Sequence, residues 1–408
     1  MNIQEIVKGI HYVGVNDRVK HKFEALWPLP YGVSYNSYIV TGDEKIALID
    51  CVSIEEVREF FSNIESIAGD RKIDYLVVNH MEPDHSGSIP EIVRAYPDIK
   101  IVGNSKTIDM IRGFYHIDNP EQFHEVKDGD KIDLGGRELT FHLTPMVHWP
   151  ETMMTYVEDV ELLFSGDAFG TFGALNGAVI DRDMETDVYI REMYRYYSNI
   201  VGKYGRFVEK ALAKLSGLKI SYICSTHGPV WNEKIAEVSE IYSRLAGYKS
   251  EPGVVIVYGS MYGNTAEIAE MIARELAAKG VKRIIIHNAS HSDLSDMITD
   301  TFRYQTLIVG SATYSMRLFP PVEAFMNAME TREIKNKIIG TFGNYTWASG
   351  VVTTKLVESA ERMKLPVTAS LIIKQSAGET TPAQVKEFAE NIYNAMTNPP
   401  EASENGEA

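Results

Sequence analysis

Two different rhythms of apolar and polar positions divide the chain. From residue 254 onward, short apolar runs alternate with amphipathic helical stretches. The expected strands are 254–258, 283–287, 306–310, 337–341 and 367–373, and the expected helices are about 264–279, 293–301, 320–331, 350–363 and 382–396. Strand–helix units repeated at this spacing predict a parallel, doubly wound sheet.

Strands dominate the first part of the chain. The runs Tyr35–Val40 and Ile46–Asp50 flank Thr-Gly-Asp-Glu, which predicts a hairpin. Ile73–Asn79 has the pattern of a buried strand, and a long helical stretch, about Asp187–Leu215, precedes another strand at Ile220–Ser225. Strand-rich runs with helices between and outside them predict a sandwich of sheets covered by helices.

The pattern changes at 247–253, Gly-Tyr-Lys-Ser-Glu-Pro-Gly, which marks a domain boundary. With 408 residues, the chain is longer than one hydrophobic core usually organises. We therefore expect one domain over 1–250 and a second over 251–398. Residues 399–408 carry Pro, Gly and acidic residues but no basic one, which predicts a disordered tail.

Composition and charge exclude several classes of protein. The formal net charge of -16 argues against nucleic acid or an anionic membrane as the main partner. The two cysteines, Cys51 and Cys224, form no C-x-x-C pair, which argues against a disulfide scaffold, structural zinc or a Cys-ligated iron–sulfur cluster. No signal peptide and no membrane-length apolar run is present, so we expect a cytoplasmic protein.

A dense group of potential metal ligands follows the strand that ends at Asn79. The run from His80 to Gly87 (HMEPDHSG) contains His80, Glu82, Asp84 and His85. A rigid strand can aim such a loop at a site. A polar loop facing solvent is the simpler interpretation of a single histidine, but two histidines and two carboxylates at this density favour metal binding.

Three further ligand-type residues occupy similar positions. His148, Asp167 and His227 each follow a predicted strand. Taken singly, each is more often a structural histidine or an Asp that caps a turn. Together with the first group they supply four histidines and three carboxylates, enough for two metal ions.

The second domain opens with a strand, the loop 259–265 (GSMYGNT) and a helix. Hydroxyls, an amide and backbone N–H groups at a helix N-terminus can hold a phosphate without a basic residue. The loop has neither the Walker lysine nor G-x-G-x-x-G, so neither ATP nor a dinucleotide is favoured. A simple strand–helix turn is the alternative for this segment alone.

The residues that follow the third and fourth strands also favour the prediction of a flavin site. The first and third strand ends flank the switch point of a flavodoxin-like sheet, where FMN binds. The candidates are Ser260, Met261, Tyr262, Gly263, Asn264 and Thr265 in the first loop, Ala312, Thr313 and Tyr314 after the third strand, and Gly343, Asn344, Tyr345 and Trp347 after the fourth. Which of the aromatic side chains stacks on the flavin stays open.

From about residue 5 to 396, the chain resembles the flavodiiron proteins (A-type flavoproteins). The order H-x-[EH]-x-D-H, then His, Asp and His, is that of the metallo-β-lactamase fold, and Glu82 stands where hydrolases of that fold usually have His. The resemblance implies an α/β protein with an N-terminal metallo-β-lactamase-like αββα sandwich and a C-terminal flavodoxin-like sheet. A carboxylate in place of imidazole suits an iron that must become ferric.

The same resemblance implies a ligand set for two non-haem irons. Residues that match His80, Glu82 and His148 hold one iron, those that match Asp84, His85 and His227 hold the other, and the residue that matches Asp167 bridges them. Adjacent Asp84 and His85 must both turn inward, which makes His85 the least secure ligand.

The implied activity is reduction of O2 to water, of NO to N2O, or of both. Two ferrous ions and reduced FMN together hold the four electrons that O2 requires, whereas two NO molecules require two. The implied partners are a separate electron donor, either a rubredoxin or a reduced deazaflavin, and a second copy of the chain in a head-to-tail homodimer, which can pair again into a tetramer. The sequence leaves the preference between O2 and NO open.

Two other functions are weighed against this one. A dinuclear zinc hydrolase fused to a flavodoxin-like domain is disfavoured by Glu82 and by the flavin loops. An electron carrier with an inert first domain would require seven ligand-type residues to persist without a role.

Overall fold

The computed structural model describes residues 3–398 and divides into two compact units, Met1–Gly247 and Tyr248–Ala408. The division falls three residues before the boundary that we placed at 250. The tail predicted over 399–408 lies outside the described residues.

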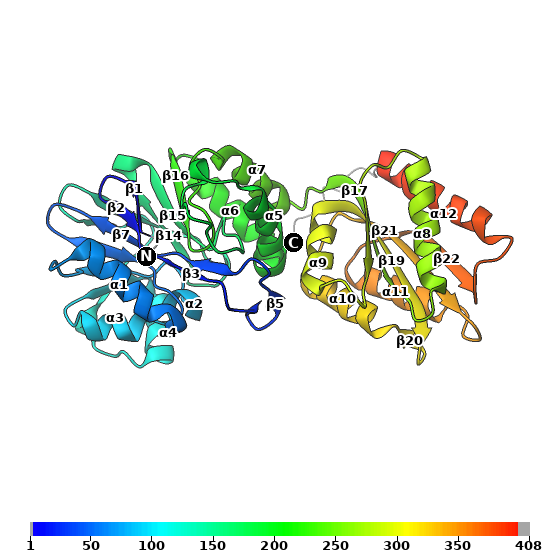
Figure 1. Ribbon diagram of the computed structural model, residues 1–408, viewed down its shortest axis with the longest axis horizontal. Helices are drawn as coiled ribbons and strands as arrows, with labels where there is room; N and C mark the ends of the chain where they lie inside the picture. Colours follow the sequence, from blue (N-terminus) through cyan, green and yellow to red (C-terminus); the bar gives the residue numbers. More distant parts are fainter. Residues whose placement is uncertain (1–2, 399–408) are drawn as a thin grey trace. The chain divides into compact units, whose positions relative to one another are not determined.

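The first unit is built on two mixed sheets (Figure 1). The seven-stranded sheet contains, in spatial order, β1 (Gln4–Val7), β2 (Ile10–Tyr12), β7 (Tyr38–Thr41), β8 (Ile46–Ile49), β9 (Tyr75–Val77), β10 (Lys100–Gly103) and β11 (Phe123–Glu125). The five-stranded sheet contains β12 (Lys131–Asp133), β13 (Glu138–Leu143), β14 (Met153–Val157), β15 (Leu162–Gly166) and β16 (Tyr222–Ser225). Two ribbons complete the strands: β3 (Val15–Asp17) with β6 (Val33–Tyr35), and β4 (Lys22–Phe23) with β5 (Trp27–Pro28).

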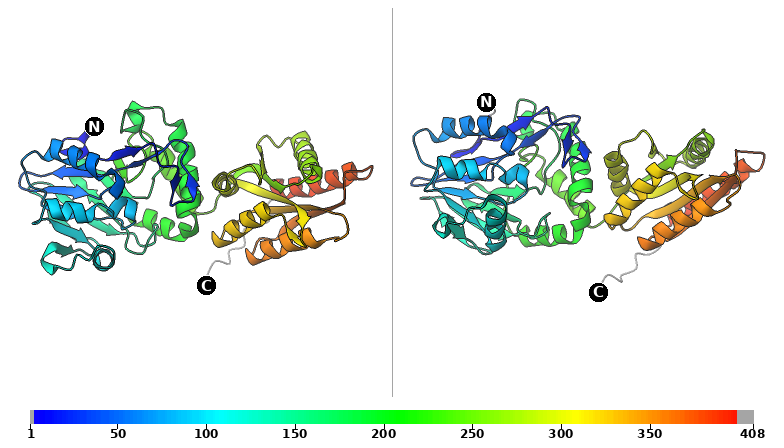
Figure 2. Two further views of the ribbon diagram at one scale, coloured as in Figure 1. Left: turned by 60° about the horizontal axis from the view of Figure 1, so that its bottom comes forward. Right: turned by 90° about the horizontal axis from the view of Figure 1, so that it is seen from below.

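Helices cover the outer faces of the two sheets, as the sequence predicts (Figures 1 and 2). On one side lie α1 (Val57–Ala68), α2 (Pro83–Ser86), α3 (Ile89–Ala95) and α4 (Ser105–Tyr115), and on the other α5 (Asp187–Tyr196), α6 (Gly205–Leu215) and α7 (Ile235–Ala246). Each sheet therefore buries one face against the other sheet and one against helices, which explains the fully buried strands β8, β14 and β15.

The long helical stretch expected over about Asp187–Leu215 is helical throughout, but it is not one continuous α-helix. A π-helical turn at Tyr197–Val201 and a 3₁₀ turn at Gly202–Tyr204 separate α5 from α6. All five residues of the π turn are buried. The wider turn lets consecutive large side chains face the core, and the glycines at 202 and 205 weaken helix continuity.

Strand direction gathers the predicted metal ligands at one edge of the sandwich. In the second sheet, β13 runs antiparallel to β14, which runs antiparallel to β15, and β15 is parallel to β16. The strands β13, β15 and β16 thus point the same way, and the loops that follow them leave from one edge. The first sheet contributes β9, which is parallel to both of its neighbours.

The second unit is a parallel sheet in the order β18-β17-β19-β21-β22, which is the flavodoxin-like order 2-1-3-4-5. The strands are β17 (Glu251–Gly259), β18 (Ile284–Asn288), β19 (Tyr304–Tyr314), β21 (Ile338–Tyr345) and β22 (Val367–Lys374), and β20 (Arg317–Leu318) pairs with the end of β19. The helices are α8 (Asn264–Ala278), α9 (Leu294–Arg303), α10 (Pro320–Thr331), α11 (Val351–Arg362) and α12 (Thr381–Thr397). This confirms the doubly wound sheet predicted from the sequence.

Helices α8 and α12 pack together on one face of this sheet, over a core that includes Ile256, Ile308 and Phe342. Helix α10 contacts both α9 and α11. Within residues 3–398, no helix is both long and apolar enough to span a membrane.

Lys337 is a buried cation at the start of β21. Its ammonium donates to Ser250 Oγ at 2.6 Å and to the carbonyl oxygens of Phe302 at 2.9 Å and Tyr304 at 2.8 Å. Burial lowers the pKa of Lys337 to about 7. The side chain therefore joins three segments of the second unit, but its charge carries a desolvation cost.

We expect Lys337 to make stability depend on pH in the alkaline range. Because its folded-state pKa lies below the unfolded value, the unfolded chain binds the additional proton between about pH 7 and 10, and the free energy of unfolding should rise with pH there. From pH 7 to 9 this rise should exceed that of Lys337→Met by about 2 kcal/mol. Urea unfolding followed by circular dichroism measures it, with exposed Lys386→Met as control. If the free energy of unfolding changed with pH in the same way in wild type and in Lys337→Met, the lowered pKa of Lys337 would be contradicted.

Candidate functional site

All seven predicted metal ligands come together in the first unit, in two groups whose ligand atoms lie within 4.8 Å of one another. One group contains His80, Glu82, His148 and Asp167, and the other contains Asp84, His85 and His227. His80, His85 and His227 are fully buried, and Asp167 is 1% exposed. Residues up to 147 positions apart in sequence thus form one buried cluster.

Asp167 belongs to the first group but also reaches the second, so that it presents one carboxylate oxygen to each. Its Oδ2 is 3.0 Å from His148 Nε2 and 3.3 Å from His80 Nε2, whereas its Oδ1 is 3.1 Å from His85 Nε2. Glu82 Oε2 is 3.0 Å from His148 Nε2 and completes the first group. A carboxylate shared in this way is suited to bridge two cations.

His85 turns inward together with Asp84, as the predicted ligand set requires. Nε2 of His85 is 3.3 Å from Asp84 Oδ2 and 3.0 Å from Nε2 of His227. His227 Nε2 is in turn 3.3 Å from Asp84 Oδ2. Two imidazole nitrogens and a carboxylate oxygen facing one another form a suitable donor set for a metal ion.

Hydrogen bonds on the outer nitrogens fix the orientation of two of these rings. Nδ1 of His80 lies 2.9 Å from Glu151 Oε1, and Nδ1 of His227 lies 2.7 Å from the carbonyl oxygen of Ser34. Both partners are acceptors, so each Nδ1 carries the proton and each Nε2 presents a lone pair to the site. Sequence reasoning missed Glu151, because one carboxylate beyond the motif gives no local signal.

Charge is concentrated in this cluster. Burial alone would raise the pKa of Asp167 and lower that of His85 and His148, but their mutual attraction outweighs it. Next to His80 and His85, the pKa of Asp167 falls well below its usual value. The pKa of His148 rises to about 9 beside Asp167 and Glu82, and that of His85 to about 9 beside Asp84 and Asp167. Protons on these rings occupy the position that a metal ion would take, so metal binding should release protons.

Aromatic side chains form the wall beside the second group. Phe23, Tyr35 and Tyr196 lie 5.3, 5.8 and 5.4 Å from the His227 ring, centroid to centroid. The hydroxyls of Tyr35 and Tyr196 are buried and have no hydrogen-bond partner among residues 3–398. A cavity of about 340 Å³ reaches this region and is lined by Phe23, Tyr35, Glu82 and Asp84, among others.

Glu24, which sequence reasoning also missed, lies at the same cavity in the tight turn between β4 and β5. Burial and the neighbouring Glu82 raise its pKa to about 7. Glu24 and Ala25 both adopt left-handed backbone angles, with φ of 48° and 57°. This strain, of a kind often found at functional sites, directs a further carboxylate, beyond Glu82, Asp84 and Asp167, toward the cluster.

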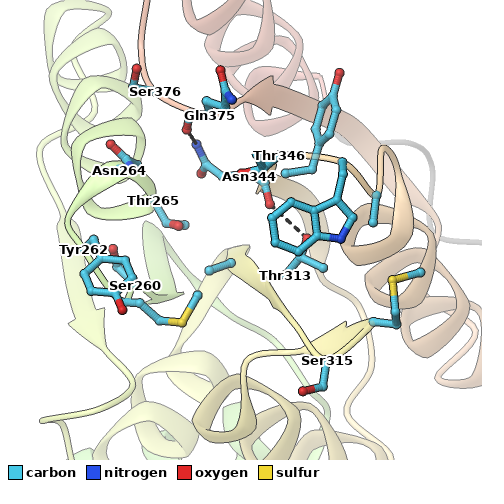
Figure 3. A pocket seen from close by; sticks show the side chains of 16 residues that line it. Ser260, Tyr262, Asn264, Thr265, Thr313, Ser315, Asn344, Thr346, Gln375 and Ser376 are labelled. Atoms are coloured by element: carbon cyan, nitrogen blue, oxygen red, sulfur yellow. Dashed lines mark hydrogen bonds between the residues drawn. The ribbon is translucent and has the colours of Figure 1, made fainter.

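The second unit contains a cavity of about 740 Å³ at the carboxyl ends of its central strands (Figure 3). Ten of the thirteen predicted cofactor residues line it: Ser260, Met261, Tyr262, Asn264, Thr265, Ala312, Thr313, Asn344, Tyr345 and Trp347. The prediction placed it at the switch point of the sheet, and the cavity lies there.

The other three predicted residues do not line this cavity. Gly263 is the N-cap of α8 with φ of 96° and donates its N–H to Ser260 Oγ, Gly343 lines a smaller adjacent cavity, and Tyr314 rests edge-on against Phe319. The cavity gains residues that were not predicted: Ser315, Met316, Thr346, Ala348, Gln375 and Ser376. Gln375 and Ser376 follow β22, and only the sheet order reveals that this strand end reaches the site.

The lining of this cavity carries no charged side chain within the described residues. Hydroxyls, amides and the N-terminus of α8 provide neutral partners for an anion. Tyr262 is 91% exposed and Trp347 is 88% exposed, although large aromatic side chains usually bury most of their surface. A phosphate group and a planar ring system both match these surroundings.

Comparisons with known proteins identify a family for each of the two units. The model of the ODP family beta lactamase matches residues 33–228, and that of flavodoxin matches residues 256–374. The anaerobic nitric oxide reductase flavorubredoxin of Escherichia coli O1:K1 is 33% identical over 393 residues, which are 94% of this chain and 81% of that protein. The chain belongs to the flavodiiron proteins.

Solved structures of flavodiiron proteins agree with the fold. Rubredoxin oxygen:oxidoreductase from Desulfovibrio gigas has a TM-score of 0.92 at 29% identity and covers 97% of this chain and 99% of its own. A variant of the flavo di-iron protein from Thermotoga maritima has a TM-score of 0.89 at 26% identity. The match covers 97% of this chain and 98% of that protein. The family resemblance and the fold class drawn from the sequence are thereby confirmed.

We expect Glu151 to strengthen metal binding in this flavodiiron protein through His80. Glu151 Oε1 also accepts from the N–H of Met81, and the pKa of Glu151 lies below its usual value because His80 outweighs the effect of burial. Glu151→Ala should weaken iron retention about 10- to 100-fold, and Glu151→Gln, which keeps the acceptor without its charge, should weaken it less. Competition with a chelator measures retention, and exposed Glu125→Gln is the control. Wild-type iron retention in Glu151→Ala would refute this role.

Proposed function

We propose that this flavodiiron protein is an oxidoreductase that reduces O2 to water, NO to N2O, or both. Two irons would bind at the seven-residue cluster and FMN in the cavity of the second unit. When bound, the irons supply open positions and electrons for a diatomic molecule, and FMN supplies further electrons. The D. gigas and E. coli relatives are named for O2 and for NO reduction, respectively.

The position of Asp167 carries this proposal. A carboxylate with one oxygen toward His80 and His148 and the other toward His85 is placed to hold two metal ions side by side. We assign His80, Glu82 and His148 to one iron and Asp84, His85 and His227 to the other. Glu82 adds a hard anionic donor, which favours ferric iron over zinc.

The surrounding side chains prepare the site for a small neutral substrate. Phe23, Tyr35 and Tyr196 exclude water from the side of His227. The hydroxyls of Tyr35 and Tyr196 lack a partner in the described part of the chain, and each can donate to a bound oxygen or nitrogen atom. The buried site thus offers hydrogen-bond donors without an additional charge.

The second unit fits FMN rather than a dinucleotide. Ser260, Asn264 and Thr265 line the cavity at the N-terminus of α8, which suits one phosphate. Exposed Tyr262 and Trp347 at the same cavity can border a flavin ring. Thr265→Asp would place a carboxylate beside the phosphate and should prevent flavin binding by repulsion between like charges.

A separate donor would deliver electrons to FMN, with a rubredoxin protein as the first candidate and a reduced deazaflavin cofactor as the second. The name of the D. gigas relative refers to rubredoxin. Neither Cys51 nor Cys224 is available for a rubredoxin-type centre, because both are buried in the first unit. The expected cytoplasmic location suits both donors.

A head-to-tail dimer would bring FMN of one chain to the irons of the other. Exposed apolar side chains lie at or next to the lining of each cavity: Val19, Leu26 and Ile54 in the first unit, and Tyr262, Met316 and Trp347 in the second. In a dimer with two-fold symmetry, the patch on the first unit of each chain would cover the patch on the second unit of its partner. Both patches of both chains would then be buried, because every contact of such a dimer occurs twice. Two such dimers can form a tetramer.

A dinuclear zinc hydrolase is the competing function. The same cluster could hold two zinc ions, but zinc has no redox chemistry and would leave the flavodoxin-like unit without a purpose. Metal analysis and anaerobic turnover with O2 and with NO, driven by one chemically reduced donor, separate the two functions. Zinc without flavin would favour hydrolysis.

Asp167→Ala should remove the bridge and destabilise both metal positions. Wild-type protein supplied with iron should hold about two irons per chain, and the variant should lose most of them along with turnover. Iron analysis and O2 and NO consumption measure the effect, and exposed Asp118→Ala is the control. Flavin content should not change, because FMN binds in the other unit. Full iron and activity in Asp167→Ala would contradict the ligand assignment.

Mixing two inactive chains tests transfer between subunits. One chain carries His80→Ala with Asp167→Ala and lacks iron, and the other carries Thr265→Asp and lacks flavin. In a purified mixed dimer, one intact FMN would face one intact iron pair, so part of the wild-type turnover should return. If both remaining cofactors are loaded and turnover stays absent, transfer between chains is disproved.

A further inference from the structure

The hydroxyl of Thr226 acts on only one of the two carboxylate oxygens of Asp167. Thr226 Oγ1 lies 2.5 Å from Asp167 Oδ1, the oxygen that faces the second group, and the hydroxyl must be the donor because an ionised carboxylate only accepts. Within the described residues, only the imidazoles of His80 and His148 lie at hydrogen-bond distance from Oδ2, the oxygen that faces the first group. The two oxygens of the bridging carboxylate therefore have unequal surroundings.

Backbone hydrogen bonds fix Thr226 in this position. Its N–H donates to the carbonyl oxygen of Gly166 at 3.0 Å, and its own carbonyl oxygen accepts from the N–H of Asn36 at 2.7 Å. The Asn36 side chain also donates to the carbonyl oxygens of Ser225 and Gly228, at 2.9 and 2.8 Å. Thr226 is 1% exposed, so its hydroxyl is shielded from solvent. The surrounding chain therefore holds this hydroxyl against the bridging carboxylate.

The histidines of the two groups differ in the same direction. In the first group, His80 Nδ1 donates to the carboxylate of Glu151 at 2.9 Å. In the second group, His227 Nδ1 donates to the neutral carbonyl oxygen of Ser34 at 2.7 Å, and His85 Nδ1 is buried without a hydrogen-bond partner in the described part of the chain. An anionic partner makes an imidazole a stronger electron donor than a neutral partner does. The first group therefore contains the more electron-rich imidazole.

The two metal positions otherwise have the same donors: two imidazoles, one carboxylate of their own and one oxygen of Asp167. Ferric iron carries one more positive charge than ferrous iron and is favoured by stronger anionic donors. A hydrogen bond donated to a carboxylate oxygen draws electron density from it, so the Thr226 hydroxyl weakens the bridge on the side of the second group. The Glu151 carboxylate strengthens the first group. Both contacts therefore favour ferric iron in the first group and ferrous iron in the second.

We infer that Thr226 and Glu151 make the two metal positions unequal in redox potential. This inference rests on the proposed binding of two irons at the cluster. One electron added to a diferric pair would convert the ferric ion of the second group to ferrous, and a second electron would then reduce the ion of the first group. Reduced FMN would be the electron donor. The half-reduced centre would therefore have its ferrous ion beside Asp84, His85 and His227.

A redox titration of the iron-loaded full chain tests this order. Low-temperature EPR follows the mixed-valent pair, whose signal grows with the first electron and disappears with the second. Thr226→Val keeps the shape of the side chain without its hydroxyl, so the equilibrium constant of the first step should fall about 3- to 10-fold, which corresponds to about 30–60 mV. In Glu151→Gln, the potential of the second step should rise, because His80 loses its anionic partner. Thr226→Ser, which keeps the hydroxyl, should match wild type.

Thr226→Ala should give the same fall in the first step and replaces Thr226→Val if the valine variant binds fewer than two irons. Thr306→Val, at a buried threonine of the second unit, is the control and should leave both steps unchanged. The inference would be overturned if Thr226→Val acted on the second step and Glu151→Gln on the first. Unchanged potentials in either variant, or a single two-electron step in wild type, would also overturn it. Wild-type protein that binds no iron would refute the proposed function instead.

Discussion

The metal centre depends on one buried carboxylate, that of Asp167, which faces imidazole rings on both sides. A buried charge is tolerated only when opposite charge and hydrogen bonds surround it. Thr226 Oγ1 donates to Asp167 Oδ1 at 2.5 Å, and the rings of His80 and His85 supply the positive charge when protonated. Metal ions would replace those protons in the same positions. The ends of several strands must therefore meet at one edge of the sandwich, and the parallel directions of β13, β15 and β16 accomplish this.

The seven residues of the cluster could be predicted from the sequence because they follow apolar strands within a few residues. Their supporting partners could not, since these are distant in sequence: Glu151 is 71 positions from His80, and Ser34 is 193 positions from His227. The break between α5 and α6 was missed for a different reason. A π turn at Tyr197–Val201 alters the apolar spacing too briefly to be distinguished from a helix that continues.

In the flavin cavity, too, some residues could be predicted from their position in the sequence, whereas others depend on the order of strands in the sheet. The loops after β17, β19 and β21 carry polar and aromatic residues at positions that the strand pattern reveals. Gln375 reaches the cavity because β22 lies beside β21, and this adjacency belongs to the sheet order. Tyr314 is an aromatic residue at the end of β19, where the sequence predicts a flavin contact. Strand β20 pairs with this end of β19, and Tyr314 rests against Phe319 and is 47% exposed.

The two sites treat charge in opposite ways. The metal cluster concentrates carboxylates and imidazoles in a buried place, whereas the flavin cavity has a neutral lining among the described residues. In a chain of net charge -16, long-range electrostatics cannot draw in an anionic nucleotide, and salt would screen any such attraction beyond about 10 Å. Retention of FMN would then depend on short directed contacts, such as those with the N-terminus of α8. Because these contacts act only at hydrogen-bond distance, they would strengthen FMN binding by slowing its dissociation rather than by speeding its association.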